Sequence, residues 1–112
     1  MTPGAFDKAC RALPGVTSVV QWGVDQVFKV GGRIFAMRGP SSGVSFKVSD
    51  IAYEALTESG RAWPAPYLAR AKWVRFDDLA GLPDDEVGDW LASAHALVAA
   101  RLTRAQRREI GL

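Results

Sequence analysis

The chain has 112 residues, a formal net charge of +2 and one cysteine. Its length favours a single domain spanning residues 1–112, which can bury roughly two thirds of its unfolded surface without crosslinks. One cysteine excludes an internal disulfide and a zinc site built on paired cysteines, so a reduced, cytoplasmic setting is expected. No apolar run approaches the roughly 18 residues of a membrane span and no signal-peptide core is evident, so a soluble protein without membrane contact is expected.

The first half of the chain has the pattern of a helix followed by four strands. Thr2 and Pro3 resemble an N-cap and a first helical residue, and the helix that they predict stops at Leu13-Pro14-Gly15. Val16 to Trp22 predicts a strand, with a turn at residues 23–25. The segment QVFKVGGRIFAMR, residues 26–38, predicts a hairpin about Gly31-Gly32. A second turn at 39–43 and a strand from Val44 to Val48 complete an antiparallel meander.

The second half alternates helices with one more strand. Ser49 or Asp50 can cap a helix through about Glu58. Residues 60–72 indicate a loop, because its prolines remove strand hydrogen-bond donors. Trp73 to Phe76 predicts a fifth strand, and a last helix begins near Pro83 with an apolar stripe formed by Val87, Trp90, Leu91, Ala94, Leu97, Val98 and Leu102. The order predicts an α+β domain, an antiparallel sheet of about five strands with helices packed on one face.

Strand alternation assigns the side chains of the sheet to two faces. If Gly31-Gly32 is a two-residue turn, Phe28 pairs with Phe35. The core face is then expected to hold Phe28, Val30, Phe35 and Met37, with Arg33 at its tip, and the other face Val27, Lys29, Ile34, Ala36 and Arg38. Val44, Phe46, Val48, Val74 and Phe76 should join the core and leave Ser45, Lys47, Trp73 and Arg75 outside. The helix-free face should therefore be a basic strip.

Charge is segregated along the chain. Two blocks contain no acid: residues 26–49, with Lys29, Arg33, Arg38 and Lys47, and residues 61–76, with Arg61, Arg70, Lys72 and Arg75. A merely solvated face usually mixes both signs, although Lys, Arg and Ser also occur ordinarily on the wet face of an antiparallel sheet. Tyr67 and Trp73 add aromatic side chains to the second block, a mixture typical of nucleic-acid surfaces. Arg101, Arg104, Arg107 and Arg108 either extend this footprint or complement a helix end.

Several motifs in order resemble the signature of the MmcQ/YjbR family of small bacterial proteins: Leu13-Pro14-Gly15-Val16, Gln21-Trp22-Gly23, the hairpin residues 28–36, Phe46-Lys47-Val48, Pro64-Ala65-Pro66-Tyr67 and Lys72-Trp73-Val74. The resemblance covers nearly the whole chain. It implies a frataxin-like α/β sandwich, described as a double-wing DNA-binding fold whose hairpins and loops act as wings. Carried onto this chain, it implicates Lys29, Arg33, Lys47, Arg70, Lys72 and Arg75. Where the family commonly has Ser-Tyr, this chain has Ala94-His95.

The sequence gives little support to catalysis or metal binding. His95, the only histidine, lies at the edge of an apolar stripe and fits a boundary residue better than a general base. Cys10 fits a buried structural thiol. The acids from Asp77 to Asp89 have the oxygen chemistry for a hard cation, but acids also stabilise a helix start by themselves. No catalytic residue, metal or cofactor is therefore expected.

The leading hypothesis is a non-enzymatic protein that binds duplex DNA through its phosphates, with weak sequence specificity. The residues predicted to make these contacts are Lys29, Arg33, Arg38, Lys47, Arg70, Lys72 and Arg75. The alternative is a protein–protein interaction module that uses the segregated basic and acidic patches. The sequence leaves the oligomeric state open.

Overall fold

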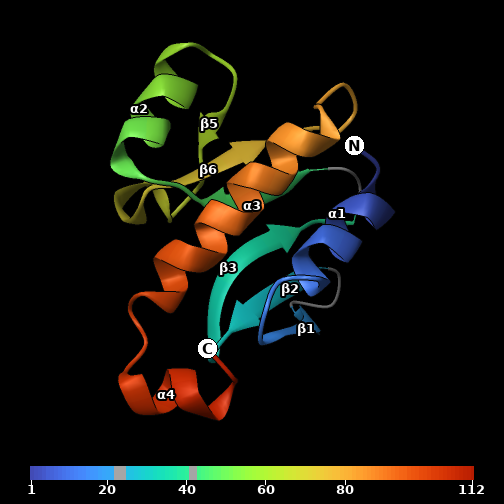
Figure 1. Cartoon of the computed structure of the whole chain (residues 1–112). Coiled ribbons are helices and arrows are strands. Elements are labelled where there is room, and N and C mark those ends of the chain that lie inside the picture. The colour runs from blue at the N-terminus through green and yellow to red at the C-terminus, as the bar shows by residue number, and fades with distance from the viewer. Residues whose placement is uncertain (22–24, 41–42) are drawn as a thin grey trace.

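The computed structural model describes residues 1–21, 25–40 and 43–112. Within them the elements follow in the order α1 (Pro3–Arg11), β1 (Val16–Gln21), β2 (Asp25–Val30), β3 (Arg33–Arg38), β4 (Val44–Lys47), α2 (Asp50–Glu58), β5 (Trp63–Pro64), the 3₁₀ helix η1 (Ala69–Ala71), β6 (Trp73–Phe76), α3 (Asp84–Ala99) and α4 (Arg104–Glu109). The strands form one antiparallel sheet in the order β1-β2-β3-β4-β6-β5. Helices α1 and α3 lie across one face of it (Figure 1). The predicted α+β class is confirmed.

Local capping explains where the helices start. The hydroxyl of Thr2 accepts a hydrogen bond from the Ala5 amide, and the hydroxyl of Ser49 accepts one from the Ala52 amide, both at 3.1 Å. Helix α3 starts after Pro83 without a side-chain cap, and acids occupy its first turn instead. Their negative charges face the positive end of the helix dipole. These helix starts agree with the predicted ones.

The core lies between the sheet and the two covering helices. Phe6 and Cys10 of α1 meet Phe28, Val30 and Phe35 of the hairpin, and all five are fully buried. The α3 stripe closes the other half of the core, and its Trp90 ring stacks 5.1 Å from the Phe76 ring. Phe28, Val30, Phe35, Val44, Phe46, Val48, Val74 and Phe76 are all buried, as predicted.

A β-bulge overturns part of the predicted hairpin register. Val30 pairs with Arg33 and Lys29 with Ile34 as expected, but the register then shifts and Phe28 pairs with Ala36 rather than Phe35. One extra residue on β3 moves every later side chain of that strand to the opposite face. Ala36 and Arg38 therefore lie on the helix face and Met37 on the helix-free face, so the predicted faces of these three residues were wrong.

Other differences concern the second half of the chain. Trp63–Pro64 forms a sixth strand, which can contain Pro64 because it lies at the sheet edge, where the missing hydrogen-bond donor costs little. The last predicted helix ends at Ala99, and residues 104–109 form the separate α4, whose start is fixed by a capping box between Thr103 and Gln106. The predicted turns at 23–25 and 39–43 fall partly outside the described residues. No helix of the described chain is long and apolar enough to cross a membrane.

Candidate nucleic-acid interface

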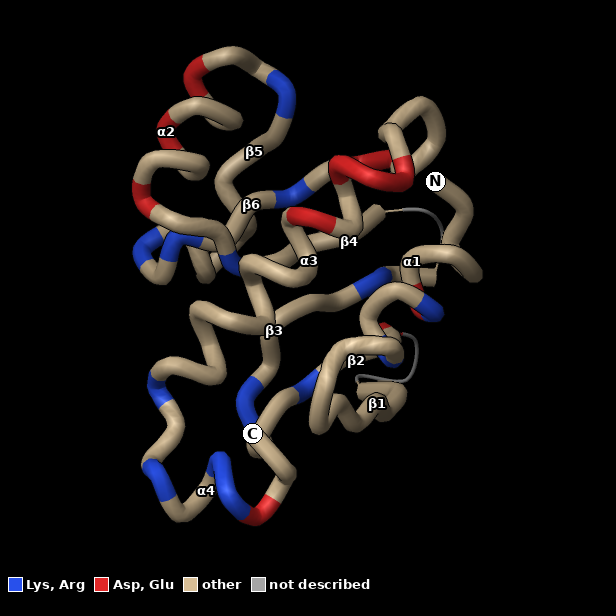
Figure 2. The backbone as a smooth tube through the Cα atoms, in the orientation of Figure 1, with Lys and Arg blue, Asp and Glu red and all other residues tan. Residues whose placement is uncertain are grey.

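Nine of the 14 Lys and Arg side chains form what we call the basic surface: Lys29, Arg33, Lys47, Arg70, Lys72, Arg101, Arg104, Arg107 and Arg108. Figure 2 shows their segments along η1, the end of β4, the end of α3, the β2–β3 turn and α4. Red segments gather instead at the start of α3 and along α2. The molecule is therefore electrically polarised, which the sequence blocks indicated only in part.

Packing joins the hairpin turn to the C-terminal cations. A Cβ atom added at Gly31 would lie 2.6 Å from Cδ1 of Leu102, so the turn sits directly against the connection between α3 and α4. In turn, Arg107 donates hydrogen bonds from Nε to the Ala99 carbonyl at 3.2 Å and from Nη2 to the Ala100 carbonyl at 2.9 Å. These bonds satisfy the C-terminal carbonyls of α3 and fix α4 beside the hairpin.

Lys47 connects the hairpin turn and the C-terminal cations to η1. Its Nζ donates to the Ala71 carbonyl, which ties the loop after β5 to the end of β4. Partial burial lowers the pKa of Lys47 from its usual range, nearby Arg101 lowers it further, and Asp50 acts in the opposite direction. Lys47 thus feels the charge of Arg101, and the two belong to one positive region. Its half-buried position makes it a structural tie as well as a candidate contact.

The 3₁₀ helix η1 presents two more cations. Arg70 is exposed, whereas Lys72 lies with Nζ 4.9 Å from the centre of the Tyr53 ring. Lys72 adopts φ of +61°, and its carbonyl accepts a hydrogen bond from the Val48 amide at 2.8 Å. This bond and the cation–π contact hold the side chain in place beside α2.

Ion pairing distinguishes the basic surface from three of the five other cations; the remaining two, Lys8 and Arg11, lie on α1. Arg38 pairs with Asp7, Arg61 with Glu86 and Arg75 with Asp77. None of the nine cations of the basic surface forms a salt bridge with a carboxylate of the described residues. Asp50 acts on Lys47, and Glu109 follows Arg108 in the chain, so acids also adjoin the basic surface without forming a salt bridge with it. A group of cations without carboxylate partners attracts anions, whereas paired cations are already neutralised.

Two residues of the predicted site lie elsewhere. Arg38 points to the helix face, where Asp7 holds it, so its predicted place on the helix-free face was wrong. Hydrogen bonding to Asp7 also raises the pKa of Arg38. Arg75 lies on the helix-free face as predicted, but its Nε is 3.1 Å from Oδ1 of Asp77. Lys29, Arg33, Lys47, Arg70 and Lys72 all belong to the basic surface, and the C-terminal arginines, left ambiguous by the sequence, complete it.

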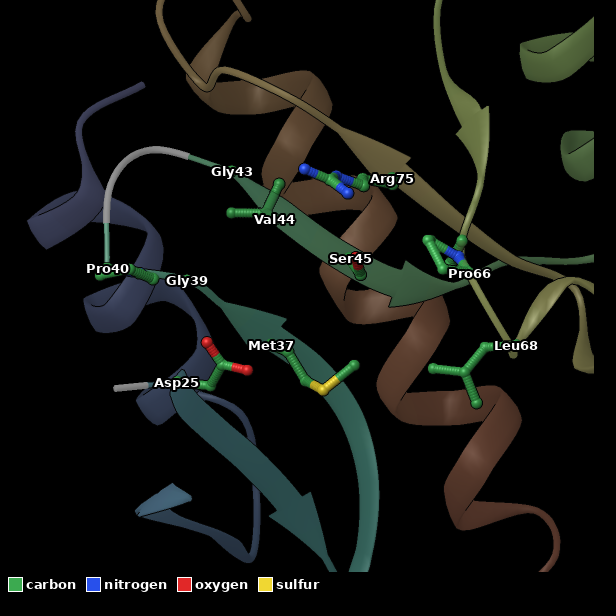
Figure 3. Close-up of a pocket in the computed structure, with 11 residues that line it drawn as sticks. Asp25, Met37, Gly39, Pro40, Gly43, Val44, Ser45, Pro66, Leu68 and Arg75 are labelled. Atoms are coloured by element: carbon green, nitrogen blue, oxygen red, sulfur yellow. The ribbon is translucent and has the colours of Figure 1, made fainter. Parts of the chain in front are cut away.

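The helix-free face carries a hollow of about 350 Å³. Figure 3 shows Met37 and Ser45 on its floor, Pro66 and Leu68 on one wall, and the charged groups of Asp25 and Arg75 at opposite ends. Met37 reaches this position only because of the bulge in β3. A register without the bulge would put Met37 on the helix face, so its place on the floor of the hollow could not be expected.

The two remaining candidate reactive groups are buried. Cys10 is 0% exposed, and burial raises the pKa of its thiol far above the ordinary value, with Asp7 adding to the rise and Arg11 opposing it. His95 is buried rather than at a boundary; its Nε2 lies 2.7 Å from the Pro14 carbonyl and therefore carries the proton. Its ring meets Phe35 edge-on at 5.5 Å. Within the described chain, no group of three His, Cys, Asp or Glu residues is placed to hold a metal ion.

Comparison with known proteins places this fold in a family. No curated protein matches the chain. Among solved structures, a crystal structure of the Deinococcus radiodurans protein DR2400, with the family-model domain DUF419, is similar with a TM-score of 0.85 and 25% identity. The match covers 99% of this chain and 88% of that one. The YjbR family model matches residues 11–97. These residues run from the end of α1 to the last turns of α3, and the chain belongs to the YjbR family.

Proposed function

We propose that this protein binds nucleic acid without catalysing a reaction, with duplex DNA as its target and the basic surface as its contact area. The observation that carries the proposal is the gathering of nine cations that have no carboxylate partner among the described residues, whereas Arg38, Arg61 and Arg75 are paired. A duplex carries regularly spaced phosphates that these cations can neutralise. Each neutralised phosphate releases condensed counterions, which favours binding.

The geometry favours contacts to phosphate over contacts to bases. Helix α3 begins with Asp84, Asp85 and Glu86, which a polyanion would repel, and α4 has only six residues. No element of the basic surface therefore resembles a recognition helix for the major groove. The hairpin turn with Arg33 and the loop with Arg70 project cations as two wings joined by Lys47 and Arg101. Contacts of this kind position a protein and carry little sequence information.

A second candidate function follows from the acidic end of the molecule. The start of α3 and the loop before it concentrate Asp77, Asp78, Asp84, Asp85 and Glu86 away from the basic surface. Opposite charges at two ends suit binding to an acidic partner protein or head-to-tail self-association. This alternative predicts an oligomer that dissociates as salt is raised, in the absence of DNA.

Fluorescence anisotropy of a labelled duplex over a salt series tests the proposal, with heparin as a competing polyanion. We expect saturable binding whose logarithmic salt slope is roughly −3.6 if four phosphates are contacted, at about 0.9 per phosphate. Size-exclusion chromatography at the same salt concentrations reports on the alternative. No binding at low salt, together with a salt-sensitive oligomer, would replace the DNA proposal with the interaction module.

A further inference from the structure

Exposed aromatic side chains are concentrated in one short loop. Trp63 is 63% exposed and Tyr67 is fully exposed, whereas every other aromatic side chain of the described residues is buried or half-buried. The sequence directed attention to Trp73, but that ring is only 6% exposed beneath η1. Leaving two large rings in water forgoes the stabilisation that their burial would give. The two rings are therefore not needed by the core.

Hydrogen bonds hold this loop in a defined shape. The Ala65 amide donates to the Trp73 carbonyl at 3.0 Å, and the Leu68 amide donates to the Ala65 carbonyl at 3.1 Å. The side chain of Ala65, between the two exposed rings in the sequence, is buried. Between these anchors Tyr67 adopts φ of +66°, a left-handed conformation that is unfavourable for a residue with a side chain. The fold thus holds an exposed tyrosine in a strained conformation, a combination that clusters at binding sites.

Cations and the hollow adjoin the loop on the helix-free face. In the sheet register, Arg75 of β6 lies opposite Trp63 of β5 on one side and opposite Ser45 of β4 on the other. The three side chains therefore form a row across these strands. Tyr67 is followed within a few residues by Arg70 and Lys72 of the basic surface. Residues 59–76 contain no acid. Aromatic rings beside such cations are the arrangement with which proteins bind unpaired strands.

The side chains that line the hollow suit a nucleobase better than a phosphate group. Met37 and Leu68 offer apolar surface, and the two charged groups face it from opposite ends (Figure 3). The Asp25 carboxylate would repel a phosphate but can accept hydrogen bonds from the N–H groups on the Watson–Crick edge of a base. A base in a duplex cannot present that edge, because its partner base occupies it.

We infer that the Trp63–Tyr67 loop and the adjoining hollow bind unpaired nucleobases, so that this protein holds a single-stranded segment across its helix-free face. The inference rests on the proposed function, because the same strand would place its phosphates on Arg70, Lys72 and Lys47. Trp63 and Tyr67 supply stacking faces, and Asp25 and Arg75 contact the edge of a base. Stacking tolerates all four bases, so sequence preference is weak.

The test compares labelled oligothymidylate with a blunt duplex of equal length. We expect Trp63→Ala and Tyr67→Ala each to weaken single-strand binding about tenfold, because each variant removes one stacking face for a base, and to change duplex binding less than about twofold. Trp63→Phe should retain most of the affinity. The matched control is Ile51→Ala, which removes an exposed apolar side chain from α2. Because all three side chains are exposed, near-ultraviolet circular dichroism and urea midpoints should confirm intact folds.

The possible results separate the two claims. Duplex binding without oligothymidylate binding, or single-strand affinity unchanged in both alanine variants, would overturn the stacking inference and leave the proposed function standing. No binding of either probe would remove the proposed function and the inference together. Selective loss of single-strand affinity in the two variants would support both.

Discussion

Arg38 of β3 donates two parallel hydrogen bonds to Asp7 of α1, from Nε to Oδ1 at 2.7 Å and from Nη2 to Oδ2 at 2.8 Å. The side chains are only 19% and 12% exposed, and Nη1 of Arg38 also donates to the Gly39 carbonyl at 3.1 Å. This pair connects the first helix to the central strand. It assigns Arg38 to the scaffold, in contrast to Arg33 at the other end of the same strand.

Removing the arginine should destabilise the protein without weakening DNA binding. We expect Arg38→Met to lower the free energy of unfolding by about 2–4 kcal/mol, because the Asp7 carboxylate is left largely buried without its partner. The double variant Asp7→Leu/Arg38→Met should recover part of this loss, and Lys8→Met on the same helix should cost little. Urea denaturation measures the stabilities, and duplex anisotropy should stay within about twofold. If Arg38→Met kept its stability but bound DNA more weakly, Arg38 would be a DNA-contacting residue rather than part of the scaffold.

The two glycines of the hairpin turn should respond differently to substitution. Both have positive φ, +57° at Gly31 and +79° at Gly32, so each alanine variant costs about 1–2 kcal/mol in backbone strain. Only at Gly31 would the new Cβ meet Leu102, whereas none of the surrounding atoms lies within 4 Å of a Cβ at Gly32. We expect Gly31→Ala to be less stable than Gly32→Ala by about 1–2 kcal/mol. Equal urea midpoints would show that the turn does not press on the C-terminal region.

The buried thiol should make stability fall in alkaline solution. The pKa of Cys10 is raised in the folded state, so its contribution is complete below about pH 9 and is lost as the pH rises further, because only the unfolded chain ionises. The stability advantage of the wild type over Cys10→Ala should shrink by up to about 1.4 kcal/mol per pH unit above about pH 9. A constant difference would contradict this. The native protein should also resist thiol reagents.

Relief of strain offers a separate check on Tyr67. Because glycine adopts positive φ without penalty, Tyr67→Gly should maintain the free energy of unfolding or raise it by about 1 kcal/mol. The same variant should lose single-strand affinity as Tyr67→Ala does. Thermal denaturation compares the variants directly. A clear loss of stability would show that Tyr67 has a packing role that its exposure does not reveal.

Local patterns predicted most of the fold. The helix starts at Thr2 and Ser49, the hairpin about Gly31-Gly32 and the buried strand residues follow from capping, turn chemistry and alternation. The bulge could not be predicted, because no local signal in β3 distinguishes the extra residue. The bulge moves the side chains of Ala36, Met37 and Arg38 to the opposite face of the sheet from the one expected, and Arg38 is one of the predicted site residues.

The site was predictable only where cations adjoin in sequence. Lys29, Arg33 and Lys47 share one acid-free block, but their proximity to Arg101 depends on how the end of α3 packs on the turn. The pairing of Arg38 was equally invisible in the sequence, since Asp7 lies 31 residues away, whereas Asp77 is only two residues from Arg75. The exposure of Trp63 and the burial of Trp73 are tertiary facts as well: the two lie on neighbouring strands at the same sheet edge.

The central claim is that the basic surface itself, and not net charge, binds the duplex. The most direct measurement compares two double variants with the same change in charge, Arg33→Glu/Arg104→Glu on the basic surface and Lys8→Glu/Arg11→Glu on α1, by anisotropy over a salt series. The first should lose about tenfold or more in affinity at low salt, with a salt slope flatter by about 1.8, while the second stays close to the wild type. Equal losses in both would contradict the claim.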